Sequence, residues 1–169
     1  IYEDLLPEVV RRLESKNLIV ESEGALVVFP DGWFNRENEP LPLIIRKGDG
    51  GFNYATTDLA CIINRVESIE CDEMLYVVGA EQSQHFSMVF QVANDAGFMD
   101  DKIKAVHVPF GLVMGSDGKK LASREGKAIT LKELLEESVD RAEKIILEKN
   151  PSMPDLERRG VSKMIGIGA

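Results

Sequence analysis

The chain has 169 residues, of which 44% are hydrophobic, so it can form about one domain with a normal core and is not a disordered segment. No apolar run approaches the roughly 20 residues of a membrane span and no basic-then-apolar leader opens the sequence, so we expect a soluble, cytoplasmic protein. The formal net charge of −9 argues against a general nucleic-acid surface, because phosphate binding needs basic groups. Cys61 and Cys71 have no metal-ligand spacing with the two histidines, so we expect reduced structural thiols and no metal site.

The first third of the chain predicts a helix followed by strands. Residues 2–16 carry an apolar stripe at helical spacing, and Pro7 suits the first turn of such a helix. Ala25–Phe29 and Leu41–Arg46 are typical of strands, and a loop rich in proline, glycine and asparagine separates them. The segment 48–51 predicts a sharp turn.

The rest of the chain alternates helices with strands. In chain order we predict a helix from Thr57 or Asp58 to about Ser68, a strand at Met74–Val78, a helix at Ser83–Ala96 ended by Gly97, a strand at Ala105–Val108, and a helix from Leu131 to about Leu147. The continuous apolar run 74–78 is typical of a strand buried on both faces of a parallel sheet. Thr130 and Glu133 form a capping box before the last helix. This order predicts an α/β fold with a parallel sheet and flanking helices.

Two loops with unusual residues follow predicted strands. The first is 79–85, and the second is 115–126, which follows an apolar strand expected at 112–114. Ligands of parallel α/β sheets bind at the carboxyl ends of the strands, so the two loops indicate a nucleotide site. Neither loop matches GxGxxG or GxxxxGK[ST], so both of those phosphate-binding motifs are absent.

Tyr54 and Asp58 lie four residues apart in the segment YATTDLA. If the helix begins slightly before Asp58, both side chains point to one side of its N-terminal end. One interpretation is that Asp58 is only a helix cap. The other is that its carboxylate pairs with a ligand cation beside the tyrosine ring, an arrangement that suits a guanidinium.

The first loop contains groups that could face a nucleotide. Gly79 allows a close approach of the backbone, Glu81 could accept hydrogen bonds from ribose hydroxyls, and the following helix N-terminus favours an anion. His85 ends this loop and could belong to the same site. The alternative is that His85 is a helix-face histidine held by a hydrogen bond.

The second loop is basic in an otherwise acidic chain. It is flanked by glycines. Residues 115–127 hold four basic residues against two acidic ones: Lys119, Lys120, Arg124 and Lys127 against Asp117 and Glu125. One interpretation is a solvated hairpin with incidental charge. The other is a loop whose lysine meets charge that develops on phosphate.

Three segments, taken together, resemble the successive motifs of arginyl-tRNA synthetases of class I. They are RKGDGGFNYATTDLA at 46–60, VVGAEQSQHF at 77–86 and HVPFGLVMGSDGKKLASREGKAITLKELLEES at 107–138. The resemblance runs from about Leu6 to Ala169. It implies the C-terminal half of a Rossmann-type catalytic domain over residues 1–150, with a strand-rich insertion at about 18–53. Residues 151–169 would be a linker and the start of a truncated helical anticodon-binding domain.

The resemblance also implies roles for individual residues. Arginine would be held by Tyr54, Asp58 and Gln82, with Asp58 as the counter-ion. The ATP site would include Gly79, Glu81, His85, Val113, Met114 and Lys120. The segment KLASR at 120–124 is similar to the K-M-S-K-S signature, which makes Lys120, Ser123 and Arg124 the expected catalytic residues. Ser123 occupies the position where many class I enzymes have a second lysine, so that cation is missing here.

The implied activity is the ATP-dependent activation of L-arginine, with Mg²⁺ accompanying ATP, followed by transfer to tRNA(Arg). The H-x-G-H signature of the class is not in this sequence. We therefore expect the chain to be a fragment that is inactive alone and that contacts tRNA mainly through absent parts. Two alternatives are another adenylate-forming α/β enzyme that ignores arginine, and a binding module that binds neither arginine nor ATP.

Overall fold

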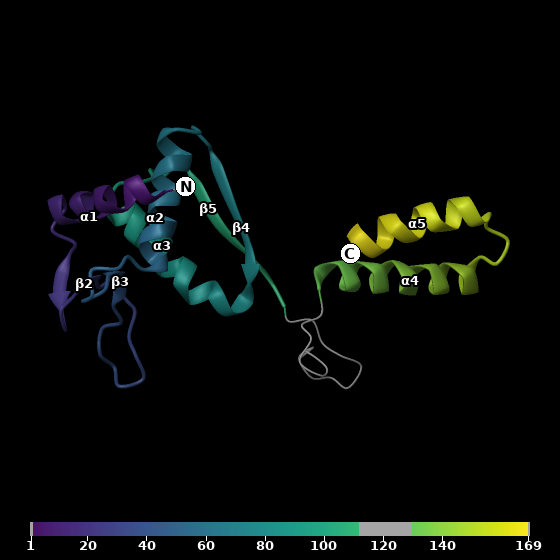
Figure 1. The fold of residues 1–169 in the computed structure, drawn as a ribbon, viewed down its shortest axis with the longest axis horizontal. Helices are drawn as coiled ribbons and strands as arrows, with labels where there is room; N and C mark the ends of the chain where they lie inside the picture. Colours follow the sequence, from purple (N-terminus) through teal and green to yellow (C-terminus); the bar gives the residue numbers. More distant parts are fainter. Residues whose placement is uncertain (1, 112–129, 169) are drawn as a thin grey trace. The chain divides into compact units, whose positions relative to one another are not determined.

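A computed structural model describes residues 2–111 and 130–168 of the chain (Figure 1). The strand expected at 112–114 lies outside the described residues, as do five predicted site residues: Val113, Met114, Lys120, Ser123 and Arg124. The chain divides into two compact units, Ile1–Gly111 and Leu112–Ala169.

The first unit has mixed α/β structure, with these elements in chain order: η1 (Glu3–Leu5), α1 (Leu6–Ser15), β1 (Val20–Ser22), β2 (Ala25–Val28), β3 (Leu43–Arg46), α2 (Tyr54–Glu67), β4 (Glu73–Gly79), η2 (Ala80–Gln82), α3 (Ser83–Asp95) and β5 (Lys104–Phe110). β4 and β5 pair in parallel, from Glu73 opposite Lys104 to Gly79 opposite Phe110. The predicted α/β class with a parallel sheet is therefore confirmed. α3 is the connection between the two parallel strands, and it ends before Gly97, whose φ of +70° suits glycine.

The β4–β5 pair is covered on one face within the described residues. Tyr76 of β4 packs against Phe86 and Phe90 of α3, with ring centroids 5.0 and 5.1 Å apart. On the other face Leu75 and Val77 are 59% and 64% exposed. The prediction that β4 is buried on both faces is therefore wrong for the described part of the chain, because the apolar run has helices on one side only.

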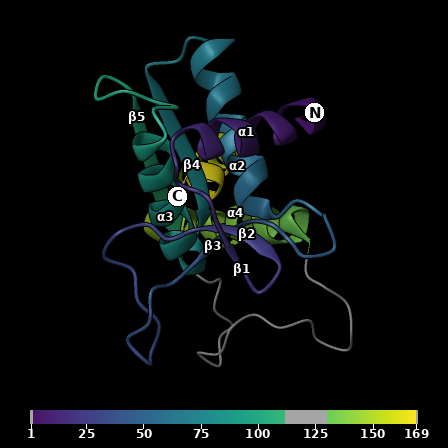
Figure 2. The same cartoon turned by 90° about the vertical axis from the view of Figure 1, so that its left-hand side faces the viewer.

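β1, β2 and β3 form a small antiparallel sheet (Figure 2), in which β1 was not expected from the sequence. The sheet is tied to α2, because the hydroxyl of Thr56 donates to the backbone carbonyl of Ile45. The loop between β2 and β3 is fixed to α3 by one side chain, Gln91. Its amide accepts from Trp33 Nε1 at 2.8 Å and donates to the Asp31 carbonyl at 3.1 Å.

α2 begins earlier than predicted. Asn53 is its N-cap, with extended backbone, and its side chain accepts a hydrogen bond from the Tyr54 amide at 2.9 Å. The helix therefore starts at Tyr54 and not at Thr57 or Asp58. The reason is that Asn53, four residues before Thr57, already accepts a hydrogen bond from the first free amide of the helix. Asp58 lies one turn inside the helix, so the interpretation of Asp58 as a cap is wrong.

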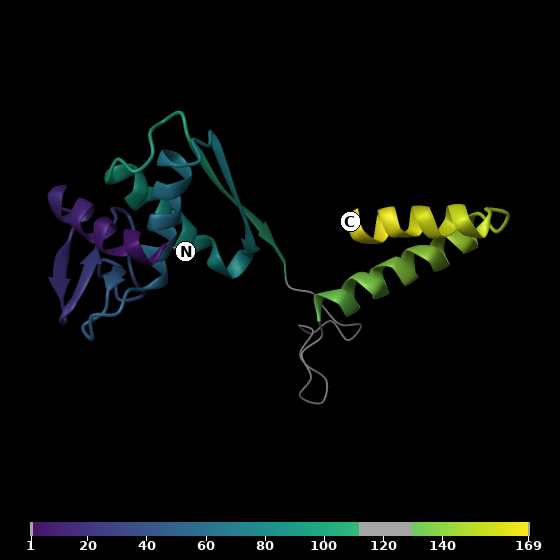
Figure 3. The ribbon, with the colours of Figure 1, turned by 45° about the horizontal axis from the view of Figure 1, so that its top comes forward.

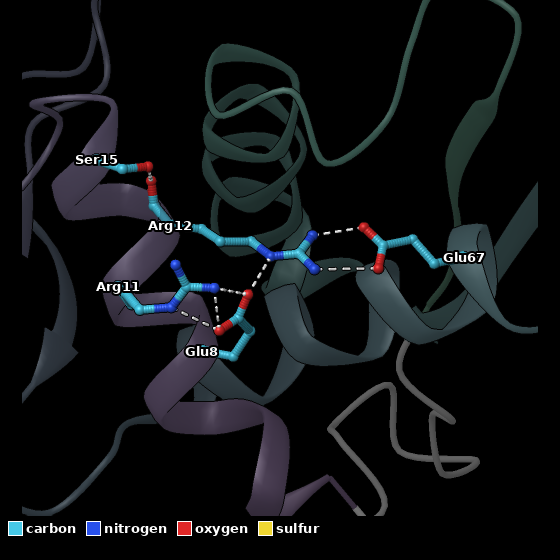
Figure 4. A network of polar contacts seen from close by, with 5 residues as sticks. All are labelled: Glu8, Arg11, Arg12, Ser15 and Glu67. Carbon is cyan, nitrogen blue, oxygen red and sulfur yellow. Dashed lines mark hydrogen bonds and ion pairs between the residues drawn. The ribbon is translucent and has the colours of Figure 1, made fainter.

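A polar network connects α1 to the C-terminal end of α2 (Figure 4). Arg12 donates from Nε to Glu8 at 2.7 Å, and its two terminal nitrogens bind the Glu67 carboxylate at 2.5 and 3.1 Å. Arg11 also binds Glu8. The hydrogen bonds from Arg12 lower the pKa of Glu67 below its ordinary value of 4.5. This network makes the packing of α1 on α2 sensitive to acid.

Glu67→Gln is expected to lower the free energy of unfolding near neutral pH by about 0.5–1 kcal/mol, since the pair is half-exposed and screened by water. A lowered pKa in the folded state gives stabilisation that is fully present above the ordinary pKa and is lost as the pH falls through the lowered one. The difference between wild type and variant should therefore disappear in acid. Urea denaturation across this pH range measures it, with Glu14→Gln on α1, the helix that carries Arg12, as the control. A difference independent of pH would contradict the assignment.

The second unit is a pair of helices, α4 (Leu131–Lys149) and α5 (Asp155–Gly168), which lie side by side (Figure 3). α4 begins with the predicted capping box, in which Thr130 and Glu133 exchange hydrogen bonds. The domain boundary predicted near residue 150 lies between these two helices, which pack against each other. The compact units of the structure divide between Gly111 and Leu112. A boundary near residue 150 in a longer protein stays a prediction. Within the described residues no helix is both long and apolar enough to cross a membrane.

Gly166 allows the close approach of α5 to α4. A Cβ at this position would lie 2.7 Å from the backbone N and Cα of Val139 and 2.8 Å from the carbonyl carbon of Ser138. These are backbone atoms of a helix, so they cannot move aside as a flexible side chain could. The contact explains a glycine inside a helix, where this residue is otherwise unfavourable.

Gly166→Ala is expected to destabilise the helix pair by about 1–3 kcal/mol through overpacking, although alanine has the better helix propensity. Gly160→Ala on the same helix is the matched control, because a Cβ there meets no atom within 4 Å. That control should stabilise α5 by up to about 1 kcal/mol. Hydrogen–deuterium exchange of the α4 and α5 amides measures both effects locally. Equal protection in the two variants would show that Gly166 is not a packing contact.

Candidate functional site

Two helix N-termini and the end of a strand meet in the first unit. β4 ends at Gly79, and the chain then passes through the short helix η2 directly into α3. α2 and α3 contact each other, and the contact of Asp58 with His85 brings their N-terminal ends close together. This arrangement brings together Tyr54 and Asp58 of α2 with Glu81 and His85, which are 27 residues further along the chain.

Asp58 and His85 are in direct contact. His85 Nε2 lies 2.6 Å from Asp58 Oδ2, and both side chains are about one quarter exposed, at 26% and 28%. A carboxylate only accepts hydrogen bonds, so His85 is the donor through Nε2. The imidazole also meets the edge of the Phe86 ring, with centroids 5.3 Å apart and planes at 72°. The Asp58 carboxylate is therefore held from a second helix while it stays accessible.

A cavity of about 360 Å³ adjoins this contact, a volume that suits a small ligand. Tyr54, Glu81 and His85 line it, and the Tyr54 side chain is 83% exposed. Asp58 and Gln82 are not among the lining residues. The sequence analysis did not predict the other lining residues: Leu41, Pro42, Leu43, Ile44, Asn53, Ala55, Gln84 and Met88. They come from three separate segments, so no local pattern could have identified them.

Glu81 folds back over the end of β4. A Cβ added to Gly79 would overlap both carboxylate oxygens of Glu81, so the absent side chain of Gly79 leaves the space that Glu81 uses. Glu81 is exposed and ends in a flexible carboxylate, which can move aside for a ligand. The close approach of a nucleotide to Gly79 stays a prediction.

His107 has a structural position that the sequence did not indicate. Its Nε2 donates to the Val78 carbonyl at 3.0 Å, and its ring lies 5.2 Å from that of Phe86. It therefore connects β5 to β4 at the residue before Gly79. The only signal in the sequence was that His107 stands between two apolar residues of the predicted strand. Among the described residues, no group of three or more His, Cys, Asp or Glu could hold a metal ion.

Comparisons with known proteins agree on one family. The family of class I tRNA synthetases (R), catalytic domain, matches residues 1–169. An arginine–tRNA ligase of Erwinia tasmaniensis is 46% identical over 169 residues, which are the whole of this chain and 29% of that protein. One from a Nostoc species is 52% identical over 141 residues, which are 83% of this chain and 24% of that protein. The chain thus spans less than a third of the length of these relatives.

Solved structures share the fold. The arginyl-tRNA synthetase of Plasmodium falciparum aligns with a TM-score of 0.67 and 23% identity, over 98% of this chain and 26% of that one. The enzyme of Thermus thermophilus gives a TM-score of 0.65 and 21% identity, over 98% of this chain and 32% of that one. Since the family match covers the whole sequence, this chain belongs to the catalytic-domain family of class I tRNA synthetases of the arginyl type.

Proposed function

We propose that this chain is part of an arginine–tRNA ligase and carries the counter-ion for the arginine side chain. One observation supports this most directly: a partly exposed carboxylate, Asp58, is oriented by His85 one helical turn from the exposed ring of Tyr54. A guanidinium is planar, pairs with carboxylates and stacks on aromatic faces. Asp58, Tyr54 and Gln82 would together recognise it.

ATP is the proposed second substrate. Gly79 and Glu81 fit a ribose at the end of β4, because a carboxylate that can swing away from glycine offers acceptors to hydroxyl groups. The N-terminus of α3, a helix of 13 residues, favours phosphate nearby. Val113 and Met114 would contact adenine, and Lys120, Ser123 and Arg124 would meet the phosphates. Mg²⁺ would enter with ATP.

The proposed reaction has two steps. The arginine carboxylate attacks the α-phosphorus of ATP in line, and pyrophosphate leaves. The terminal hydroxyl of tRNA(Arg) then attacks the carbonyl of the adenylate, and AMP leaves. Little covalent chemistry falls to the protein, so its contribution is positioning and stabilisation of charge. We also propose a cytoplasmic location and a first step that requires bound tRNA.

Isotopic ATP–pyrophosphate exchange on the full-length protein tests this function. Exchange should require arginine, should not occur with lysine, and should be measured with and without tRNA(Arg). Exchange that ignores the amino acid would favour an adenylate-forming enzyme of another kind. Absence of both arginine and ATP binding by calorimetry would favour a non-catalytic module.

A further inference from the structure

The contact between His85 and Asp58 is a specific one. Among the described residues, each side chain has the other as its only side-chain hydrogen-bond partner, and Asp58 Oδ1 has none. The distance of 2.6 Å is at the short end for a nitrogen donor on a carboxylate. His85 therefore fixes one oxygen of Asp58 and leaves the other open to a ligand.

The two residues come from different helices, and this restricts the orientation of the Asp58 carboxylate. Asp58 belongs to α2 and His85 to α3, so the direction of the carboxylate follows from the packing of two helices and not from one side-chain rotamer. His85 is itself placed by the Phe86 ring. A carboxylate held in this way loses little rotational freedom when a ligand binds, which favours affinity.

The chemistry of the donor matters as much as its position. His85 donates one hydrogen bond, from Nε2 to Oδ2, and leaves Oδ1 of the negatively charged Asp58 carboxylate for a ligand cation. A lysine or arginine in the same place would pair with that charge and compete with the ligand. Among the described residues, Glu81 is the one other titratable group that lines the adjoining cavity, apart from Tyr54 and His85, and it is acidic.

We infer that His85 is a positioning residue for Asp58, and that it strengthens arginine binding by orienting the counter-ion. The inference rests on the proposed function. It differs from the sequence-based expectation that His85 contacts ATP. The two roles predict different substrates to be affected when His85 is changed.

The test compares two amide variants of the full-length enzyme. His85→Gln places an N–H close to the position of Nε2, whereas the shorter His85→Asn places it near Nδ1, out of reach of Asp58. His85→Asn should raise the KM for arginine about 10- to 100-fold, the loss expected for a hydrogen bond to a charged group, and leave the KM for ATP within about twofold. His85→Gln should restore most of the affinity. Ser87→Ala, on the outer side of the same helix, is the control and should match wild type.

A second pair of variants separates orientation from charge and from the proposed function. His85→Lys supplies a donor together with a positive charge, so it should bind arginine as poorly as His85→Asn. In an Asp58→Asn background, His85→Asn should cause no further loss. If Asp58→Asn weakens arginine binding but His85→Asn does not, the inference fails and the proposed function stands. If Asp58→Asn itself has no effect, the proposed function fails. A rise confined to the KM for ATP would overturn the inference in favour of nucleotide binding.

Discussion

Asp58→Asn is expected to raise the Kd for arginine by about two to four orders of magnitude while the Kd for ATP changes little. The substitution keeps the shape and the hydrogen bond to His85 but removes the charge opposite the guanidinium. Loss of one partner from a largely desolvated ion pair costs about 3–5 kcal/mol, because the remaining charge is left without compensation. Isothermal calorimetry with each substrate on the full-length protein measures the two constants.

The control for this variant is Asp95→Asn. Asp95 is exposed at the end of α3, far along the helix from His85, so its charge should not affect either substrate. Circular dichroism establishes that both variants are folded. An unchanged arginine Kd in a folded Asp58→Asn protein would leave the carboxylate with a structural role only, and the proposed guanidinium site would have to lie elsewhere.

Lys120→Ala is expected to lower the kcat of adenylate formation by about 10²–10³, with little change in the KM for arginine. The prediction rests on the similarity of KLASR to a class I signature, since this segment lies outside the described residues. A cation that acts on charge developing on the phosphates contributes in the transition state and not in the ground state, so kcat falls and affinity does not. Single-turnover formation of labelled adenylate measures the chemical step directly.

Lys119→Ala provides the neighbouring comparison. The two lysines are adjacent, so general attraction of ATP to a basic loop would make the two variants equally impaired. A specific role for Lys120 predicts a large loss in one and a small loss in the other. Wild-type kcat in Lys120→Ala would transfer the role to Lys119 or Arg124, or remove it from this loop.

Local signals in the sequence were sufficient for most helices and strands. The capping box at Thr130 and the glycine after α3 depend on neighbouring residues only, and both are confirmed. The start of α2 was predicted at Thr57 or Asp58, whereas Asn53 is the N-cap, and both Asn53 and Asp58 are residue types that cap helices. Which one caps depends on where the preceding β3 strand delivers the chain, since Asn53 also donates its backbone amide to the Ile45 carbonyl.

Long-range contacts decided what the sequence left open. The order of helices and strands along the sequence determined the α/β class and the parallel pairing, and the resemblance of its motifs indicated the family to which the chain belongs. The exposed face of β4 and the close approach of α5 at Gly166 follow from which surfaces meet. The contact of His85 with Asp58 could not be predicted from the sequence either, since the two residues are 27 positions apart and meet only where α2 packs on α3. Periodicity assigns each side chain to a face of its own helix, whereas the tertiary structure decides which faces share a site.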